Sequence, residues 1–527
     1  MIVPIAILLA GSVVVYGVGR LTHNKAVTGF AAIVAILAAG TVLYMNAPET
    51  LMGTETIQEA GAAVEIPEGT AGGAMWDAGR MIGFSETVMR EAITIREVGA
   101  DLLARFQLDG LGFFLGIVAM GLALVVALYS VGYMHKDRIG KYYALLLMMT
   151  AGMVGVGLAT DLFNMFVMFE LMSLASFALV AFETDKWEPV EAGVKYLIMS
   201  AIGSMIALLG IVVIFIHSGT LSIPQLQHAG FAAAHPDLSL AIAALLIAGF
   251  GVKSAIVPMH TWLPDAHSAA PSGISAMLSG IVISAGLITM IKALTALNGL
   301  HLGLLVALFA VITMFVGNFL AWVQSDLKRM LAYSSIAHMG YILVGVGVAF
   351  AAPEMAAFAG MRGGLFHILT HAIMKGGAFL CAGAILALLG TRNMNKMGGV
   401  GARNPLLGIA FAIFVLGLAG TPPMNGFISK LYLCKGALVI GEWGLVLTAL
   451  IIINSVISLF YYLPALNKIL FGASDEEDQE APYAVLPTSM TLAIFILAIL
   501  TLVIGIVPEF GLNIVDPAAE FLRAALH

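Results

Sequence analysis

Residues 162–174 read LFNMFVMFELMSL, an apolar run with one ionisable side chain inside it, Glu170. Residues 248–258, AGFGVKSAIVP, enclose Lys253 in the same way. About 20 apolar residues in a helix cross a bilayer core about 30 Å thick, so both runs are predicted to lie in membrane spans. An ionisable residue at the centre of a span costs about 2.5–3.5 kcal/mol on insertion scales. A chain that buries several of them is therefore predicted to move ions or protons.

The composition indicates a membrane protein throughout. Of its 527 residues, 60% are hydrophobic and 10% are charged, and the mean hydropathy is +1.00. A soluble domain carries about 25% charged residues, so most of this chain has no aqueous surface to cover. The net charge of −7 gives no indication of a nucleic-acid partner. The two cysteines, Cys381 and Cys434, have no ligand spacing, and neither a metal site nor a cofactor is predicted in this chain.

Apolar runs of the required length predict an all-α polytopic membrane protein with about fourteen transmembrane helices. They lie near residues 2–21, 27–45, 109–131, 142–160, 162–182, 191–216, 238–264, 272–297, 301–323, 332–350, 362–389, 405–436, 443–470 and 488–508. Basic residues fall mainly in the loops after odd-numbered spans, whereas the short loops after even-numbered spans hold only Arg362 and Lys435. The positive-inside rule then places both termini on the extracytoplasmic side of the cell membrane.

The spans divide the chain into five expected parts. These are two N-terminal spans (1–45), an extracytoplasmic hydrophilic loop (46–108), spans 3–8 (109–298), spans 9–13 (299–470), and an acidic loop with the last span and tail (471–527). The loop 46–108 is interpreted as an amphipathic helix on the membrane or a docking surface for a neighbouring subunit, with a tolerated insertion as the alternative.

Two spans are predicted to be broken helices. Lys253 comes five residues before Pro258, and a proline removes a backbone hydrogen bond and kinks or breaks a helix. A second break is expected at residues 420–426, GTPPMNG, with Lys430 just beyond it. Broken helices with charges at corresponding places in two halves are typical of a transport site. Spans 4–8 and 9–13 are accordingly predicted to be two inverted five-helix repeats.

Glu170 lies about nine residues, or about 13 Å, into its span, close to the middle of the membrane. An opposite charge close by stabilises the charged form of each partner. A Glu170–Lys253 pair that opens would therefore release a proton from the lysine, which makes it a usable switch. The alternative is a static buried salt bridge that only fixes packing.

A polar stripe is predicted on the eleventh span. Residues 366–375, FHILTHAIMK, place His367, His371 and Lys375 at four-residue steps, so that they share one helix face. With an unperturbed pKa near 6.5, histidine accepts and releases protons at physiological pH. A lone histidine is more often a packing residue, but three ionisable groups on one stripe indicate a proton wire or a water-channel lining.

Several motifs resemble a known family. They are residues 161–170 (DLFNMFVMFE), 262–267 (WLPDAH), 333–340 (YSSIAHMG), 366–383 and 422–430. Together they are similar to the antiporter-like proton-pumping subunits of respiratory complex I, a module shared with Mrp-type sodium/proton antiporters and membrane-bound hydrogenases. The resemblance covers roughly residues 109–470.

The resemblance implies a fourteen-helix fold with inverted repeats and a role for each buried group. Glu170 matches the family's fifth-span glutamate and Lys253 its seventh-span lysine, while the histidine-rich eleventh span and Lys430 match the central relay and the exit. Protons would come from the cytoplasm, cross a hydrated axis at mid-membrane and leave near Lys430. Partners would be homologous antiporter-like subunits and small membrane subunits. Any redox chemistry would belong to partner subunits and not to this chain.

Ser284 departs from the family pattern. Many relatives carry a lysine at this place in the eighth span, eight residues before a basic residue that is Lys292 here. A hydroxyl holds a water but stores no proton at neutral pH, so the path would need ordered water or must depend on His338, His367 and His371. Three hypotheses follow: a H⁺-translocating subunit of a redox-driven complex, a subunit of a Mrp-type Na⁺/H⁺ antiporter, and a structural subunit whose path is partly silenced.

Overall fold

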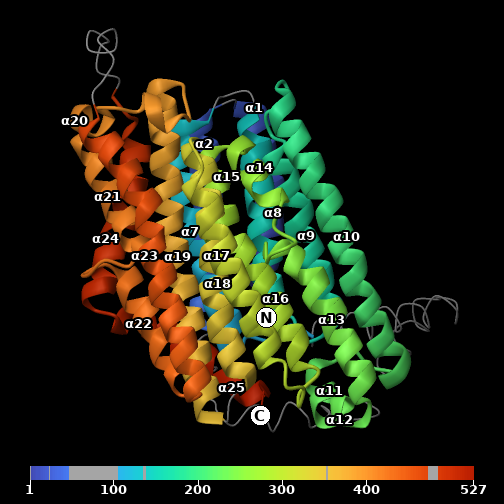
Figure 1. The fold of residues 1–527 in the computed structure, drawn as a ribbon. Helices are drawn as coiled ribbons and strands as arrows, with labels where there is room; N and C mark the ends of the chain where they lie inside the picture. Colours follow the sequence, from blue (N-terminus) through green and yellow to red (C-terminus); the bar gives the residue numbers. More distant parts are fainter. Residues whose placement is uncertain are drawn as a thin grey trace, which may run out of the picture.

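The computed structural model describes residues 2–22, 24–46, 105–134, 138–351, 354–472 and 485–526. Across these ranges the chain is almost entirely helical, and its helices run side by side in one bundle (Figure 1). Most of the hydrophilic loop expected at 46–108, and all of the acidic run 475–480, lie outside the described residues.

Thirteen helical segments in the described ranges are long and apolar enough to span a membrane. They are α1 (Val3–Thr22), α2 (Lys25–Met45), α7 (Gly110–Tyr133), α8 (Ile139–Leu158), α9 (Leu162–Val180), α10 (Trp187–Ser218), α13 (Pro236–Lys253), the continuous α15–η2–α16 segment (Ser272–Thr295), α17 (Gly303–Trp322), α18 (Leu327–Ala351), α19 (Glu354–Leu389), α23 (Glu442–Phe471) and α24 (Thr488–Ile506). The broken pair α21 (Pro405–Ala419) and α22 (Asn425–Leu438) supplies the remaining expected span. The predicted all-α polytopic fold is confirmed.

Both predicted breaks are present. Helix α13 ends at Lys253, and α14 (Trp262–Ala269) starts only after a turn that contains Ala255 at a φ of 53°. The seventh span is thus shorter than the expected 238–264. Helix α21 ends before Gly420, whose φ of 89° belongs to the left-handed region that favours glycine. A Cβ added there would lie 3.0 Å from Cδ of Lys430, so glycine also leaves room for that side chain.

Three features were not predicted. The eighth span contains a π-helical turn, η2 (Leu278–Val282), between α15 (Ser272–Met277) and α16 (Ile283–Thr295). The tail forms α25 (Glu509–Leu526), which packs against α7 and α19. Short helices also occur in the connections: α11 (Ile223–His228), α12 (Phe231–Ala234), η3 (Met394–Lys396) and α20 (Val400–Arg403).

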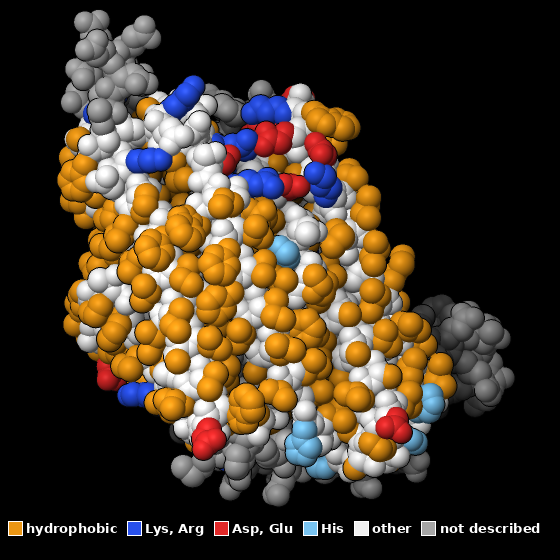
Figure 2. Space-filling model, viewed as in Figure 1, with side chains coloured by type: hydrophobic (Ala, Val, Ile, Leu, Met, Phe, Trp, Pro, Cys, Tyr) orange, Lys and Arg blue, Asp and Glu red, His pale blue; other side chains and the backbone are white. Residues whose placement is uncertain are grey.

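The surface agrees with a multi-pass membrane protein. Figure 2 shows a broad hydrophobic band over the flanks, with lysine and arginine gathered at one end of the bundle. Ion pairs join neighbouring segments, among them Arg138–Asp185 at 2.9 Å and Arg329–Asp265, which connects α18 to α14 at 2.7 Å. Large exposed apolar side chains on α10, such as Ile202 and Met205, suit contact with lipid.

Candidate functional site

Lys253 is 1% exposed at the C-terminal end of α13. Its Nζ donates a hydrogen bond of 3.1 Å to Oγ of Ser176 on α9. The same nitrogen lies 4.5 Å from the ring centroid of Tyr196 and 5.1 Å from that of Phe177, which is cation–π distance. A hydroxyl and two aromatic rings thus hold the lysine head in place.

Glu170 is half-buried on α9 and accepts a hydrogen bond from the hydroxyl of Ser204 on α10. Within the described part of the chain, no direct ion pair joins Glu170 to Lys253. The structure therefore holds the two groups of the expected pair apart. Each of them contacts a serine hydroxyl instead.

Three histidines meet where α18 and α19 pack together. Nδ1 of His338 lies 2.9 Å from Nε2 of His367, and the ring centroids of His338 and His371 are 5.1 Å apart. His367 reaches α22 through Ser429, with 2.9 Å between Nδ1 and Oγ. All three side chains are at most 1% exposed. The predicted stripe on α19 is thus extended by His338 into a cluster that joins three helices.

The two lysines beside this cluster are also bound to polar groups. Lys375 donates to Oγ of Ser334 at 2.6 Å and to the hydroxyl of Tyr462 at 3.4 Å. Lys430 donates to the carbonyl oxygens of Leu418 and Ala419, both at 3.0 Å, and to Oγ of Ser455 at 2.7 Å. The carbonyls at the C-terminal end of a helix have no intrahelical donors and carry partial negative charge, so α21 offers Lys430 a suitable site.

Tyr341 connects the histidine cluster to Lys430. The Lys430 Nζ lies 4.9 Å from the centroid of the Tyr341 ring. That ring is 5.6 Å from the rings of both His338 and His367. The central relay and the exit residue inferred from the sequence are therefore neighbours in the bundle.

Ser284 is fully buried, and its hydroxyl has no hydrogen-bond partner among the described residues. Lys292 does not take its place: its Nζ donates to the carbonyl of Gly157 at 2.7 Å and lies 3.8 Å from Oδ2 of Asp109. Burial raises the pKa of the Asp109 carboxyl, and the Lys292 ammonium opposes that shift. In the π turn η2 of the eighth span, the hydroxyl of Ser279 lies 2.6 Å from that of Ser335 on α18.

The helices that carry these groups follow one another through the bundle. Helix α13 packs on α16, the π turn η2 packs on α19, and α19 packs on α22. In Figure 1, α10 and α13 lie on one side and α21 to α24 on the other. The buried groups from Glu170 to Lys430 thus extend across the width of the bundle.

Sequence reasoning missed several polar side chains. The hydroxyls of Ser176 and Ser204 contact the expected pair, and Tyr196 contacts Lys253 through its ring and Ser176 through its hydroxyl. Such residues are common in apolar helices, so the sequence gave no signal for them. His267 on α14 is fully buried, is stacked on Phe379 at 4.8 Å, and has two ring nitrogens without hydrogen-bond partners in the described ranges. Its position in the WLPDAH motif was the available signal. No group of three or more His, Cys, Asp or Glu side chains in the described residues could hold a metal.

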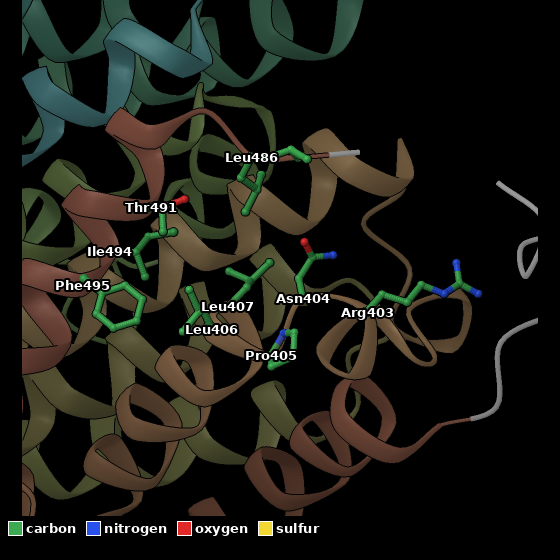
Figure 3. Close-up of a pocket in the computed structure, with 10 residues that line it drawn as sticks. Arg403, Asn404, Pro405, Leu406, Leu407, Leu486, Thr491, Ile494 and Phe495 are labelled. Atoms are coloured by element: carbon green, nitrogen blue, oxygen red, sulfur yellow. The ribbon is translucent and has the colours of Figure 1, made fainter. Parts of the chain in front are cut away.

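A surface pocket of about 290 Å³ lies away from these groups, between the start of α21 and α24 (Figure 3). Its lining is Arg403, Asn404, Pro405, Leu406, Leu407, Val485, Leu486, Thr491, Ile494 and Phe495. None of the site residues contributes to it.

Fold and buried groups define an antiporter-like membrane subunit. A family model described as NADH:quinone oxidoreductase/Mrp antiporter, TM, matches residues 159–458, and one described as NADH-ubiquinone oxidoreductase (complex I), chain 5 N-terminus, matches 97–143. The chain therefore belongs to the NADH:quinone oxidoreductase/Mrp antiporter membrane-subunit family.

Individual proteins agree with this assignment. The F(420)H(2) dehydrogenase subunit N of Methanosarcina mazei is 34% identical over 431 residues, which cover 79% of this chain and 85% of that protein. The NADH-quinone oxidoreductase subunit N 1 of Sorangium cellulosum is 34% identical over 424 residues, covering 76% and 81%. A chain of the Mrp complex from Dietzia sp. DQ12-45-1b has the same fold, with a TM-score of 0.79, 21% identity and full coverage of both chains.

Proposed function

We propose that this chain translocates protons across the membrane as one subunit of a multisubunit complex, and that partner subunits carry the redox chemistry that drives it. The two relatives named above are subunits of a dehydrogenase and an oxidoreductase, which supports a redox-driven complex. Homologous antiporter-like subunits and small membrane subunits are the proposed partners.

One observation carries the proposal: lysines and histidines that can exchange protons are buried across the bundle and contact hydroxyls. Lys253, Lys375 and Lys430 are each at most 7% exposed, and Tyr341 lies between Lys430 and the histidine cluster. Keeping such groups at depth is costly, and their usual role is a proton or ion pathway. Lysine and histidine can each take up a proton from one neighbour and pass it to the next.

The orientation of the chain is inferred from the charge of its two ends, and the direction of proton movement is the one that the family resemblance implies. Lysine and arginine gather at one end of the bundle, and the positive-inside rule makes that end cytoplasmic (Figure 2). Both chain termini are then extracytoplasmic. Protons would reach Glu170 and Lys253 from the cytoplasm and leave near Lys430.

The test is reconstitution of the whole complex with Lys253→Ala or Glu170→Ala. We expect proton movement to fall in both variants while the complex still assembles. If both variants move protons and sodium at the wild-type level, the transport role proposed for Glu170 and Lys253 is wrong.

A Mrp-type Na⁺/H⁺ antiporter without redox chemistry is the second candidate, because the family model covers both kinds of protein and the Mrp chain shares the fold. Proteoliposomes given a pH gradient and no electron donor distinguish the two. Sodium-dependent proton release under these conditions supports the antiporter, and its absence supports the redox-driven complex.

The third candidate is a structural subunit with a partly silenced path. The observation that favours it is Ser284, whose buried hydroxyl has no hydrogen-bond partner among the residues that the structure describes. Ser284→Lys tests it directly. If the path is silent, the complex pumps as before, whereas a clear gain or loss shows that the axis is active.

A further inference from the structure

We propose that three hydroxyls on α10, those of Tyr196, Ser200 and Ser204, carry protons between Glu170 and Lys253 together with Ser176 of α9. We call this set the hydroxyl row. The inference rests on the proposed function and names the groups that connect the two ionisable residues which the structure holds apart.

Both ends of the hydroxyl row are in place. Ser204 donates to the Glu170 carboxylate. At the other end, the hydroxyls of Tyr196 and Ser176 are 3.0 Å apart, and Lys253 Nζ donates to Ser176 at 3.1 Å. Helix α10 therefore contacts the glutamate through one hydroxyl and the lysine's serine partner through another.

Ser200 lies midway between the two ends. It is 3% exposed, and its hydroxyl makes no hydrogen bond to any described residue. The spacing Tyr196, Ser200, Ser204 is four residues at each step, so the three side chains share one face and rise about 6 Å per step. A buried polar group normally has a partner, and one water with bonds to its neighbours is a common solution. Two waters, one on each side of Ser200, would span the two steps and complete the row.

Two packing contacts fix the position of the hydroxyl row relative to Lys253. The Tyr196 ring is stacked on Trp262 at 3.9 Å with an interplanar angle of 3°, and the indole Nε1 of Trp262 donates to the carbonyl of Val252 at 2.7 Å. Trp262 thus links Tyr196 to Val252, the residue before Lys253. Beside Ser204, a Cβ added at Gly203 would lie only 2.7 Å from the carbonyl oxygen of Gly249 on α13, so the backbones of α10 and α13 approach closely there.

A hydroxyl suits this role because it donates one hydrogen bond and accepts others. Each oxygen in the row takes a proton from one neighbour as it gives its own proton to the next. The Ser176 hydroxyl donates to the carbonyl of Ser173 at 2.8 Å in the structure, so it must turn toward Tyr196, 3.0 Å away, before it passes a proton on. One proton leaves the Lys253 ammonium, one arrives at the Glu170 carboxylate, and every hydroxyl ends with the proton count with which it started. The reverse transfer follows the same route, and the two side chains need not touch.

The experiment compares variants of the assembled complex in native membrane vesicles. Tyr196→Phe and Ser200→Ala each remove one hydroxyl and keep the ring or the backbone, whereas Ser200→Thr keeps the hydroxyl. Matched controls are Tyr142→Phe and Ser239→Ala, because Tyr142 is a buried tyrosine bonded to Ser130 at 2.8 Å and Ser239 is a buried serine without a partner in the described ranges. Proton uptake is measured against electron transfer, with NADH or reduced F420 as the donor, and complex abundance is measured in parallel.

We expect Tyr196→Phe and Ser200→Ala to lower proton uptake per electron to the same level as Lys253→Ala, because a positioned proton-transfer group contributes about 10²–10⁴ in rate and its loss stops transfer through this subunit. Ser200→Thr and both controls should pump as the wild type. If Ser200→Ala lowers the abundance of the complex, protons moved per electron are measured in the assembled fraction only. A value below that of Ser200→Thr then shows that the hydroxyl itself is needed. If Ser200→Ala and Tyr196→Phe pump as the wild type while Glu170→Gln does not pump, the hydroxyl row does not carry protons. The proposed function of the chain would still stand. Wild-type pumping in Glu170→Gln and Lys253→Ala would overturn the function itself.

Discussion

Nδ1 of His338 lies 2.9 Å from Nε2 of His367 although the two residues belong to different helices, α18 and α19. One nitrogen of this contact must donate and the other accept, so the protonation of one ring is coupled to that of the other. The contact makes His338 a direct neighbour of the stripe on α19.

The first prediction concerns this histidine pair. His338→Leu and His367→Leu should each reduce proton pumping by the complex, and the double variant should lose little more than either single one, because residues that act as a unit are not additive. Pumping rates of the three variants check this. His217→Leu is the control, since His217 is an exposed histidine on α10. Fully additive losses would show that the two rings act independently.

The second prediction separates the two roles of Lys430. Lys430→Ala should abolish the exit step and also destabilise the subunit by about 1–3 kcal/mol, because the buried oxygen of Leu418 loses its donor. Ser455 still donates to the carbonyl oxygen of Ala419 at 2.9 Å, so the C-terminal end of α21 should stay folded. Thermal melting of the purified complex measures the loss. Lys435→Ala, on the exposed face of α22, should change neither melting nor pumping.

The third prediction tests the packing of α10 on α13. Gly203→Ala should destabilise the subunit by about 1–3 kcal/mol, because the new methyl group collides with the backbone of α13 and forces the helices apart. Gly210→Ala is the matched control on the same helix, where the nearest atoms would lie 3.4 Å away. That change should be neutral or stabilising by up to about 1 kcal/mol, the usual gain in helix propensity. Equal melting temperatures for the two variants would contradict the packing argument.

The main outline of the fold could be predicted from the sequence because lipid imposes simple rules. Span length and apolar composition predicted the number and the positions of the helices. Two proline-containing segments predicted the breaks beside Lys253 and Lys430. The π turn at Leu278–Val282 could not be predicted, because it depends on packing between helices and its residues are ordinary apolar and small ones. Helix α25 was missed because it is amphipathic and too polar for a span.

The sequence predicted which ionisable residues form the candidate site, but it did not predict which polar groups they contact. Glu170, Lys253, Lys375 and Lys430 stand out in apolar runs, since charges there are rare. The direct contact expected between Glu170 and Lys253 is not present, and each side chain instead makes a hydrogen bond to a serine, Ser204 and Ser176 respectively. Serine and tyrosine are common in apolar helices, so only the three-dimensional arrangement reveals these partners.

The most direct test of the account is the number of protons moved per electron by the assembled complex with Lys253→Met. Methionine keeps the length and the apolar stem of the side chain and removes the group that exchanges protons. The exposed Lys468→Met is the control, since that lysine contacts Asn395 at the surface. The account predicts a lower ratio for Lys253→Met and an unchanged ratio for Lys468→Met, with electron transfer present in both. An unchanged proton-to-electron ratio in Lys253→Met would contradict it.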